Sequence, residues 1–203
     1  MKQKLIHNLS FHPLSLNRWK DFEDFFGDKG ACAGCWCMYW FMMKKEYDEK
    51  RKDGRTKKEM KKMVKNSLQP GIIAYADDKP IGWIAIQPRE KYPRLSNSKI
   101  LKPVDDKAVW SIVCFFVHKD YRKMGISVEL IKNACVFAAS KGGMIVEAYP
   151  TDTKNNNSVP VFIYTGTASA FKKAGFKEVL RRSETRPIMR LNLKHRSSQK
   201  ING

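Results

Sequence analysis

The chain has 203 residues, of which 42% are hydrophobic and 11% aromatic, so it is long and apolar enough for one globular domain with a full core. Its formal net charge of +19 favours anionic ligands or acidic surfaces, although a solvated lysine-rich face gives the same composition. The absence of any apolar run of about 18 residues and an odd count of five cysteines predict no membrane span, no disulfide framework and a reducing cytoplasm.

The N-terminal third predicts one strand and two helices. A strand is predicted over residues 3–11, and a helix over residues 16–26, where apolar residues recur every three or four positions. Residues 44–56 are highly charged and indicate a loop or a solvated helix. Thr56 is placed to cap a second helix, because Glu59 stands three positions later, as a capping box requires.

The middle of the chain predicts a β-hairpin, a long connection, and then a strand followed by a helix. Residues 71–78 and 79–86 are apolar runs joined by a tight turn, which is typical of a hairpin. After a connection with three prolines over 88–107, residues 110–117 predict a buried strand. Apolar residues with 3.6-residue spacing from residue 126 onward predict one buried helix stripe.

The C-terminal part completes a mixed sheet. The predicted elements are a strand over 144–149, a short helix over 165–174, and strands over 176–180 and 187–193. The fold class is therefore mixed α/β, with a mostly antiparallel sheet of six to seven strands, a parallel strand–helix–strand unit at 110–149, and about four flanking helices. We expect a single domain over residues 1–193, followed by a basic tail over 194–203.

The turn between the strand at 110–117 and the following helix is suited to binding an anion. Its sequence is Arg122-Lys123-Met124-Gly125-Ile126-Ser127. Backbone N–H groups at a helix N-terminus have no acceptor within the helix and carry the positive end of its dipole, so they bind phosphate readily. Lys119, Arg122 and Lys123 add positive charge at the same place.

Two motifs together resemble the GNAT superfamily of acetyl-CoA-dependent N-acetyltransferases. The first is Arg122-x-x-Gly125-x-Ser127 after a hydrophobic strand, and the second is Lys172-Lys173-Ala174-Gly175-Phe176, about fifty residues later. The family's first signature is (Arg/Gln)-x-x-Gly-x-(Gly/Ala), and Ser127 departs from it at the last position. The element order over 70–193 matches the family, and residues 14–68 would supply the acceptor-side helices.

The resemblance implies an acyltransferase that uses acetyl-CoA as co-substrate, by direct transfer in a ternary complex and without a metal. Backbone N–H groups of residues 123–127 would hold the CoA pyrophosphate, and the pantetheine arm would lie between strands 110–117 and 144–149. One N–H group on the strand at 110–117 would stabilise the oxyanion that develops on the thioester oxygen. The implied cofactor-binding residues are Phe115, Phe116, Val117, Arg122, Lys123, Met124, Gly125, Ile126 and Ser127.

The proton chemistry points outside these motifs. An amine attacks a thioester only when it is neutral, so a base must remove a proton. The tyrosine that sits near the sulfur in many family members falls on Phe171 here, which has no proton to give. Glu147 and Tyr149 share one strand face, as candidate base and donor, or as an ion-pair partner and a packing residue. Tyr164 either reaches the cofactor sulfur or is a core residue at the helix entry.

The cysteines allow two further interpretations. Cys32, Cys35 and Cys37 are closely spaced, but three thiols make only part of a tetrahedral zinc site and no second Cys/His pair stands nearby at ligand spacing. A thiol or zinc module built on them is therefore an alternative function, and our expectation is that no metal binds. Cys114 is either an acetyl-accepting nucleophile or a small core residue.

The acceptor is expected to be the primary amine of a small molecule or a peptide. An aromatic cluster would form one wall of its pocket and attract a cation, or else would be a plain aromatic core: Trp36, Tyr39 and Trp40. The basic segments 44–65 and 181–203 suggest an alternative nucleic-acid-binding protein with a CoA-binding fold. Their aromatic residues do not alternate with the charges, which disfavours RNA. The family resemblance allows a monomer or a homodimer.

Overall fold

The computed structural model describes residues 6–153 and 164–193. Among these residues, seven strands form one sheet in the order β1-β2-β3-β4-β5-β7-β6. The strands are β1 Leu9–Pro13, β2 Gly71–Ala76, β3 Lys79–Pro88, β4 Trp110–Val117, β5 Ile145–Ala148, β6 Lys177–Arg181 and β7 Pro187–Asn192. β4 and β5 pair in parallel, and the other neighbours pair antiparallel. The predicted mixed and mostly antiparallel sheet is confirmed.

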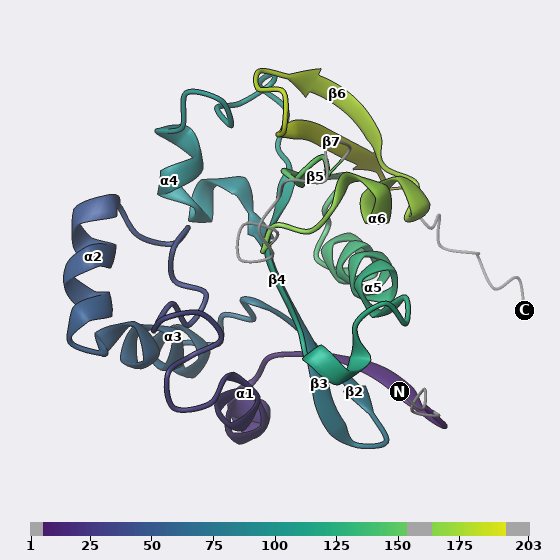
Figure 1. Ribbon diagram of the computed structural model, residues 1–203. Helices are drawn as coiled ribbons and strands as arrows, with labels where there is room; N and C mark the ends of the chain where they lie inside the picture. Colours follow the sequence, from purple (N-terminus) through teal and green to yellow (C-terminus); the bar gives the residue numbers. More distant parts are fainter. Residues whose placement is uncertain (1–5, 154–163, 194–203) are drawn as a thin grey trace, which may run out of the picture.

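The helices cover both faces of this sheet. They are α1 Trp19–Phe26, α2 Lys44–Lys52, α3 Arg55–Lys65, α4 Pro93–Ser96, α5 Ile126–Ser140 and α6 Ala168–Lys173. In Figure 1, α1, α2 and α3 lie on one side of β4, and α5 and α6 lie on the other. Because strand side chains alternate, Trp83 and Ala85 of β3 join the core beneath α1, while Ile84 and Ile86 join the core beneath α5.

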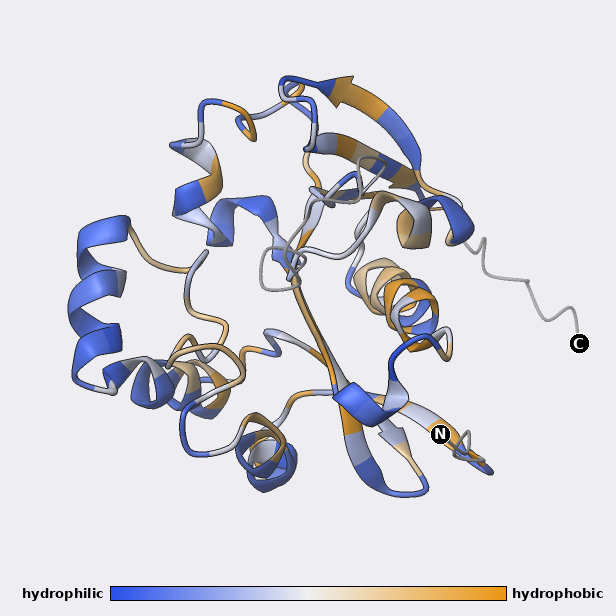
Figure 2. Ribbon diagram, in the orientation of Figure 1, coloured by the Kyte–Doolittle hydropathy of each residue, from blue (hydrophilic) through white to orange (hydrophobic). Residues whose placement is uncertain are grey.

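The structure modifies two predictions for the N-terminal third and decides between the two alternatives of a third. β1 spans Leu9–Pro13 rather than residues 3–11, of which 1–5 lie outside the described residues. The charged segment forms the solvated helix α2, which is hydrophilic over nearly its whole length in Figure 2 and buries only Tyr47. The capping box is wrong. Gly54 is the N-cap of α3, and the Thr56 hydroxyl instead donates to the Gly34 carbonyl at 2.7 Å.

The predicted hairpin, the parallel unit and the closing strands are confirmed. The connection over 88–107 contains the short helix α4, which the sequence pattern does not indicate. Within the described residues, no helix combines the length and the apolar composition that crossing a bilayer would require.

β4 and β5 separate part-way along β4. Their pairing covers only Trp110 to Ile112 of β4, which then continues to Val117 alongside β3. The register of β3 against β4 shifts by one residue here, because Ala85 faces Cys114 while Ile86 faces Ile112. The extra β4 residue forms a bulge, which bends a strand and ends regular pairing. The sheet is therefore split open beside the second half of β4.

Candidate functional site

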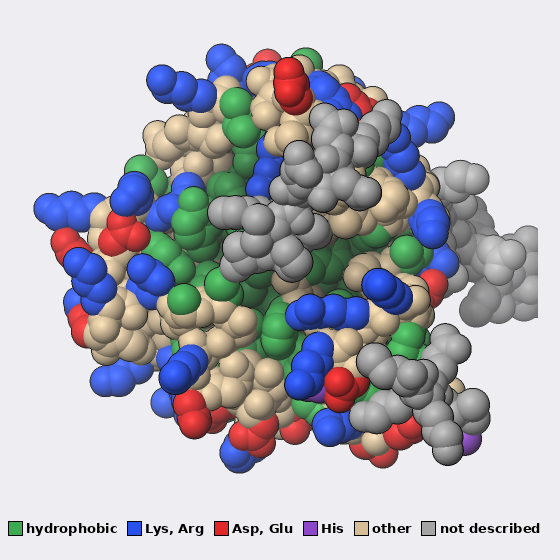
Figure 3. All heavy atoms as spheres, in the orientation of Figure 1, with side chains coloured by type: hydrophobic (Ala, Val, Ile, Leu, Met, Phe, Trp, Pro, Cys, Tyr) green, Lys and Arg blue, Asp and Glu red, His purple; other side chains and the backbone are tan. Residues whose placement is uncertain are grey.

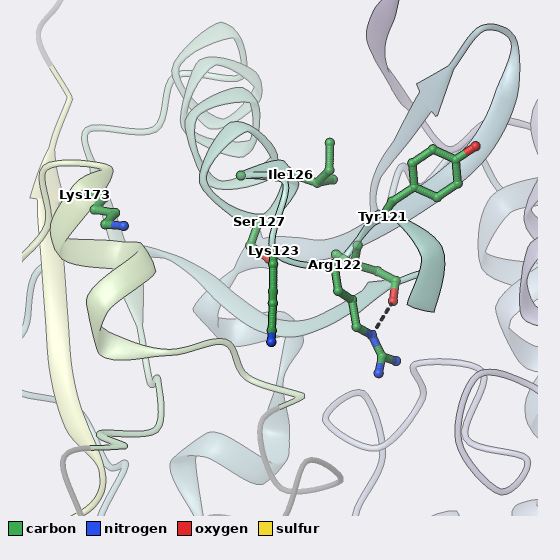
Figure 4. A pocket seen from close by; sticks show the side chains of 8 residues that line it. Tyr121, Arg122, Lys123, Ile126, Ser127 and Lys173 are labelled. Carbon is green, nitrogen blue, oxygen red and sulfur yellow. Dashed lines mark hydrogen bonds between the residues drawn. The ribbon is translucent and has the colours of Figure 1, made fainter. Parts of the chain in front are cut away.

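A pocket of about 230 Å³ lies where β4 leads into α5, at the position of the predicted anion-binding turn. The residues that line it are Val117, Tyr121, Arg122, Lys123, Gly125, Ile126, Ser127 and Lys173. Six of these belong to the cofactor-binding set predicted from the sequence. Figure 4 shows the pocket between the start of α5 and α6, with Lys123 in the turn before α5 and Lys173 at the end of α6.

The backbone of the turn presents N–H groups to this pocket. Lys123 and Gly125 both have left-handed backbone angles, with φ of 64° and 80°. Gly125 is the N-cap of α5, and the first N–H groups to bond within the helix are those of Val128 and Glu129. The N–H groups of Ile126 and Ser127 precede these bonds, so they are donors for an anion. The Arg122 Nε donates to the Val117 carbonyl at 3.1 Å, which fixes the guanidinium at the pocket edge.

Two residues change the predicted cofactor set. Met124 does not line the pocket, and its side chain packs partly buried against the core beneath α5. Lys173 does line it, although it is outside the predicted cofactor-binding set. Its contribution arises because α6 packs beside α5, a contact that sequence spacing alone does not reveal.

The open edge of β4 carries the expected backbone donors, but one is already bonded. The Phe115 N–H donates to the Tyr164 carbonyl at 2.5 Å. Since N–H groups of successive strand residues point to opposite edges, the Val117 N–H faces the same open edge, whereas the Phe116 N–H faces β3. Of the three predicted strand donors, Phe115 and Val117 therefore lie at the split.

Tyr164 stands beside this edge. Its partly buried side chain contacts the Tyr39 ring edge-on, with centroids 6.3 Å apart. Burial, followed by the neighbouring Tyr39 hydroxyl, raises the pKa of Tyr164 above its ordinary value of about 10. The phenol is therefore protonated at neutral pH and is able to donate a proton or a hydrogen bond.

Glu147 and Tyr149 lie together on one face of the sheet, as their spacing predicts. The Tyr149 hydroxyl donates to the Glu147 carboxylate at 2.5 Å and lies 2.9 Å from the Ser111 hydroxyl. Arg89 bonds one carboxylate oxygen of Glu147 at 3.0 Å, and Arg190 bonds the other at 2.7 Å. The Glu147 side chain is only 1% exposed. Both of its oxygens are thus engaged by arginines inside the protein.

The same network extends to the surface and holds Tyr149 in its neutral form. Arg190 makes two further bonds to Asp105, at 2.7 and 2.9 Å, and the hydrogen bonds from Arg190 lower the pKa of the Asp105 carboxyl. Burial, followed by the charge of Glu147, raises the pKa of Tyr149. The network therefore joins the end of β3 to β4, β5 and β7 at the point where the sheet opens.

The predicted aromatic wall divides into two parts. Trp36 and Trp40 are buried, and Trp36 stacks on Phe26 with centroids 5.5 Å apart. Tyr39 is partly exposed, and the Arg94 guanidinium lies over its ring at 3.9 Å. The cation–π position on Tyr39 is thus filled by a side chain of the protein. Figure 3 shows hydrophobic side chains in a hollow at the centre of this face, with lysine and arginine around its rim.

Cys37 and Cys114 meet beside the open edge of β4, with their sulfur atoms 3.0 Å apart. Burial, followed by the nearby Cys114 thiol, raises the pKa of Cys35, whereas Cys32 is exposed. Within the described residues, no group of three or more His, Cys, Asp or Glu side chains is arranged to hold a metal ion. The three closely spaced cysteines therefore lie in different surroundings. Cys37 contacts Cys114 on β4, whereas Cys32 is at the surface.

Sequence reasoning missed Tyr92 and Arg89. The Tyr92 side chain is fully buried in the core beneath α1, and its hydroxyl has no hydrogen-bond partner among the described residues. Burial, followed by the nearby Cys37 and Cys114 thiols, raises the pKa of Tyr92. Both residues come from the connection over 88–107, and a lone Arg or Tyr in a proline-containing connection gives no local signal of its role.

The fold resembles those of several solved acetyltransferases. One is a PaiA N-acetyltransferase from Thermoplasma acidophilum in complex with coenzyme A, at 14% identity and a TM-score of 0.52, covering 92% of this chain and 99% of that chain. Another is an N-acetyltransferase from Staphylococcus aureus Mu50, at 13% identity and a TM-score of 0.53, with the same coverage. The NatC complex bound to Gag peptide and CoA matches at 10% identity and a TM-score of 0.52, again with the same coverage.

At these identities the likeness establishes the fold alone. A comparison with curated proteins found no match. The family model for the acetyltransferase (GNAT) family, however, matches residues 33–163, which is more than half of the chain. The matched range includes β4, the anion-binding turn, α5 and β5, in the order that places the pocket beside the split sheet. The chain therefore belongs to the GNAT family of acetyltransferases and is an acyltransferase.

Proposed function

We propose that this acetyltransferase transfers the acetyl group of acetyl-CoA directly to a primary amine, in a ternary complex and in the reducing cytoplasm. The observation that carries the cofactor assignment is the cationic pocket at the start of α5, placed at the end of an open strand edge. The pocket would hold the CoA pyrophosphate through the N–H groups of Ile126 and Ser127. Lys123 and Lys173 would complement its charge.

The open edge of β4 would hold the pantetheine arm. The Phe115 and Val117 N–H groups face this edge, and a donor here would stabilise negative charge on the thioester oxygen. The Phe115 N–H already donates to the Tyr164 carbonyl. The Val117 N–H is therefore the candidate donor to the thioester oxygen. Acetyl-CoA supplies the activated acyl group, and this chain supplies charge complementarity, orientation and a proton donor.

Tyr164 is our candidate for that proton donor. It is protonated at neutral pH, it is only partly buried, and its backbone is fixed to the cofactor strand. A thiolate leaving group with a pKa of about 8.5 benefits from such an acid without requiring it. Tyr164 would thus take the place of the family tyrosine that falls on the buried Phe171 here.

We assign Glu147 and Tyr149 a positioning role rather than the roles of base and donor. A general base needs a free lone pair within reach of the substrate proton, and both Glu147 oxygens are bonded to arginines in the interior. The Tyr149 hydroxyl is likewise held between Glu147 and Ser111. Together with Arg89, they would keep β4 and β5 at a fixed separation.

The acceptor pocket would favour an amine that also carries an anionic group. Arg94 covers the Tyr39 ring, and one of its terminal nitrogens is buried without a hydrogen-bond partner in the described part of the chain. A carboxylate on the acceptor would pair with the partly exposed Arg94 guanidinium, whereas a second positive charge would be repelled. Amino acids and peptides with a free carboxylate therefore rank above polyamines as acceptors.

An acetyl-CoA turnover assay across amine classes tests this function. We expect release of free CoA with amino acids or peptides and little release with polyamines or with carboxyl-amidated versions of the same acceptors. Acetyl-CoA at 100 times its Kd should also raise the free energy of unfolding by about 2.7 kcal/mol. No stabilisation by acetyl-CoA would contradict the cofactor assignment, and turnover of polyamines alone would contradict the acceptor assignment.

A further inference from the structure

The contact between Cys37 and Cys114 joins two segments that are far apart in the sequence. Cys37 lies in the connection between α1 and α2, and Cys114 lies on β4, 77 positions later. Their sulfur atoms are 3.0 Å apart, and both thiols are free. The Trp83 indole N–H donates to the Cys37 sulfur at 3.0 Å, which fixes that sulfur between β3 and β4.

The backbone around Cys37 is held in an unfavourable conformation that turns this thiol inward. Trp36 and Cys37 have φ angles of 45° and 57°, a region that L-amino acids other than Asn and Asp seldom adopt. Such angles persist only when surrounding packing fixes them. The Trp36 ring provides that packing, since it is buried against Phe22 and Phe26.

The two thiols differ in how reagents reach them. Cys114 is partly exposed and lies just beyond Ile112, the last β4 residue paired with β5. Cys37 is buried, and burial, followed by the adjacent Cys114 thiol, raises its pKa. A small molecule would therefore reach Cys114 first, with Cys37 as the neighbour already in contact.

We propose that Cys37 and Cys114 are a modification site that forms a reversible intramolecular disulfide by exchange with a small-molecule disulfide. Cys114 loses its proton and attacks one sulfur of that molecule. The S–S bond breaks, one small thiol leaves with the proton, and a mixed disulfide remains on Cys114. Cys37 then loses its proton and attacks the Cys114 sulfur, the mixed S–S bond breaks, and the second small thiol leaves with that proton. One small disulfide has been reduced to two thiols, and two cysteine thiols have been oxidised to one disulfide.

The product would tie the loop that carries the acceptor-side aromatic residues to the strand that carries Phe115. In the cytoplasm such disulfides are usually transient and sense the redox state. The proposal concerns the thiols alone and does not depend on which amine is acetylated.

Peptide mapping of the full chain in glutathione redox buffers tests this proposal. After incubation with oxidised glutathione and alkylation of the remaining thiols, we expect a linked peptide pair containing Cys37 and Cys114, which reduced glutathione reverses. Exposed Cys32 should carry glutathione instead, and buried Cys135 should stay free. In Cys37→Ser, the fraction of Cys114 that retains glutathione should rise about tenfold, because the resolving thiol is gone.

Cys135→Ser is the matched control, since Cys135 is also buried but lies on α5 beneath the opposite face. It should leave the linked pair unchanged. Recovery of Cys114 linked to Cys35, or of glutathione on Cys114 with Cys37 present and free, would overturn the proposal. So would linkage that appears only under conditions that unfold the chain. Mapping of the unsubstituted chain decides the matter even if Cys37→Ser fails to fold.

Discussion

The proposed cofactor side of the sheet comes from one short stretch, whereas the proposed acceptor side is assembled from segments distant in sequence. The pocket at the start of α5 is lined almost wholly by residues 117–127, with Lys173 as the one addition. The network around Glu147 draws instead on Arg89, Ser111 and Arg190, from three other segments. A backbone anion site needs only a turn and a helix start, so local sequence encodes it. A buried charge needs partners, and only the folded chain brings these together.

Gly125→Trp tests the local character of the cofactor side, and we expect its effect to be the largest. An indole at the N-cap of α5 would fill the pocket and disrupt the left-handed turn, so acetyl-CoA binding should fall by more than about a hundredfold. Calorimetric titration measures this. Gly142→Trp is a matched control, because both glycines have φ near 80° and space for a Cβ, and Gly142 follows the other end of α5. Equal loss of binding in both variants would contradict the assignment.

Glu147→Gln tests the network around Glu147, whose residues come from distant segments. Removing the charge between Arg89 and Arg190 should reduce the free energy of unfolding by about 3 kcal/mol, because breaking a buried ion pair leaves uncompensated charge. Urea denaturation measures the loss. A variant of unchanged stability whose activity falls chiefly at lower pH would instead identify Glu147 as the general base.

Tyr149→Phe should cost about 2 kcal/mol at neutral pH, because Glu147 and Ser111 lose a buried hydrogen-bond partner. The raised pKa of Tyr149 also makes stability depend on alkaline pH. In the unfolded chain the phenol ionises near pH 10, so the folded state loses this contribution as the pH rises above that value. The variant should show a shallower alkaline decline in melting temperature. An unaltered decline would show that other groups cause it.

Tyr164→Phe should lower kcat about tenfold while the Kd for acetyl-CoA stays within about twofold, since the ring is kept and only the proton donor is lost. Steady-state kinetics and calorimetry separate the two effects. Tyr39→Phe is the control, because Tyr164 contacts the Tyr39 ring. This variant should keep the kcat of the unsubstituted chain. A kcat of Tyr164→Phe equal to that of the unsubstituted chain would remove Tyr164 as the acid.

Lys173→Ala should have the smallest effect, a loss of about two- to fivefold in acetyl-CoA affinity that shrinks with added salt, because exposed charges are screened. Lys172→Ala is the control, because Lys172 is also exposed on α6 but does not line the pocket. A salt-independent loss, or an equal loss in both variants, would argue against a direct charge contact.

The sequence by itself predicted the strands from residue 71 onward, the start of α5, the parallel β4–β5 unit and most of the pocket lining. Each depends on near neighbours: alternation for strands, 3.6-residue spacing for the helix, and Gly125 where the backbone turns left-handed. The capping box failed because α3 begins at Arg55 with Gly54 as its N-cap, and the Thr56 hydroxyl donates to the Gly34 carbonyl, outside its own helix.

Tertiary structure alone decided what the isolated polar and sulfur-containing residues do. It set Glu147 between two arginines, placed Arg94 over Tyr39, added Lys173 to the pocket and brought Cys37 to Cys114. The physical reason is range. Backbone geometry and apolar periodicity are properties of a few consecutive residues, whereas ion pairs and thiol contacts depend on which distant segments the packed core brings together.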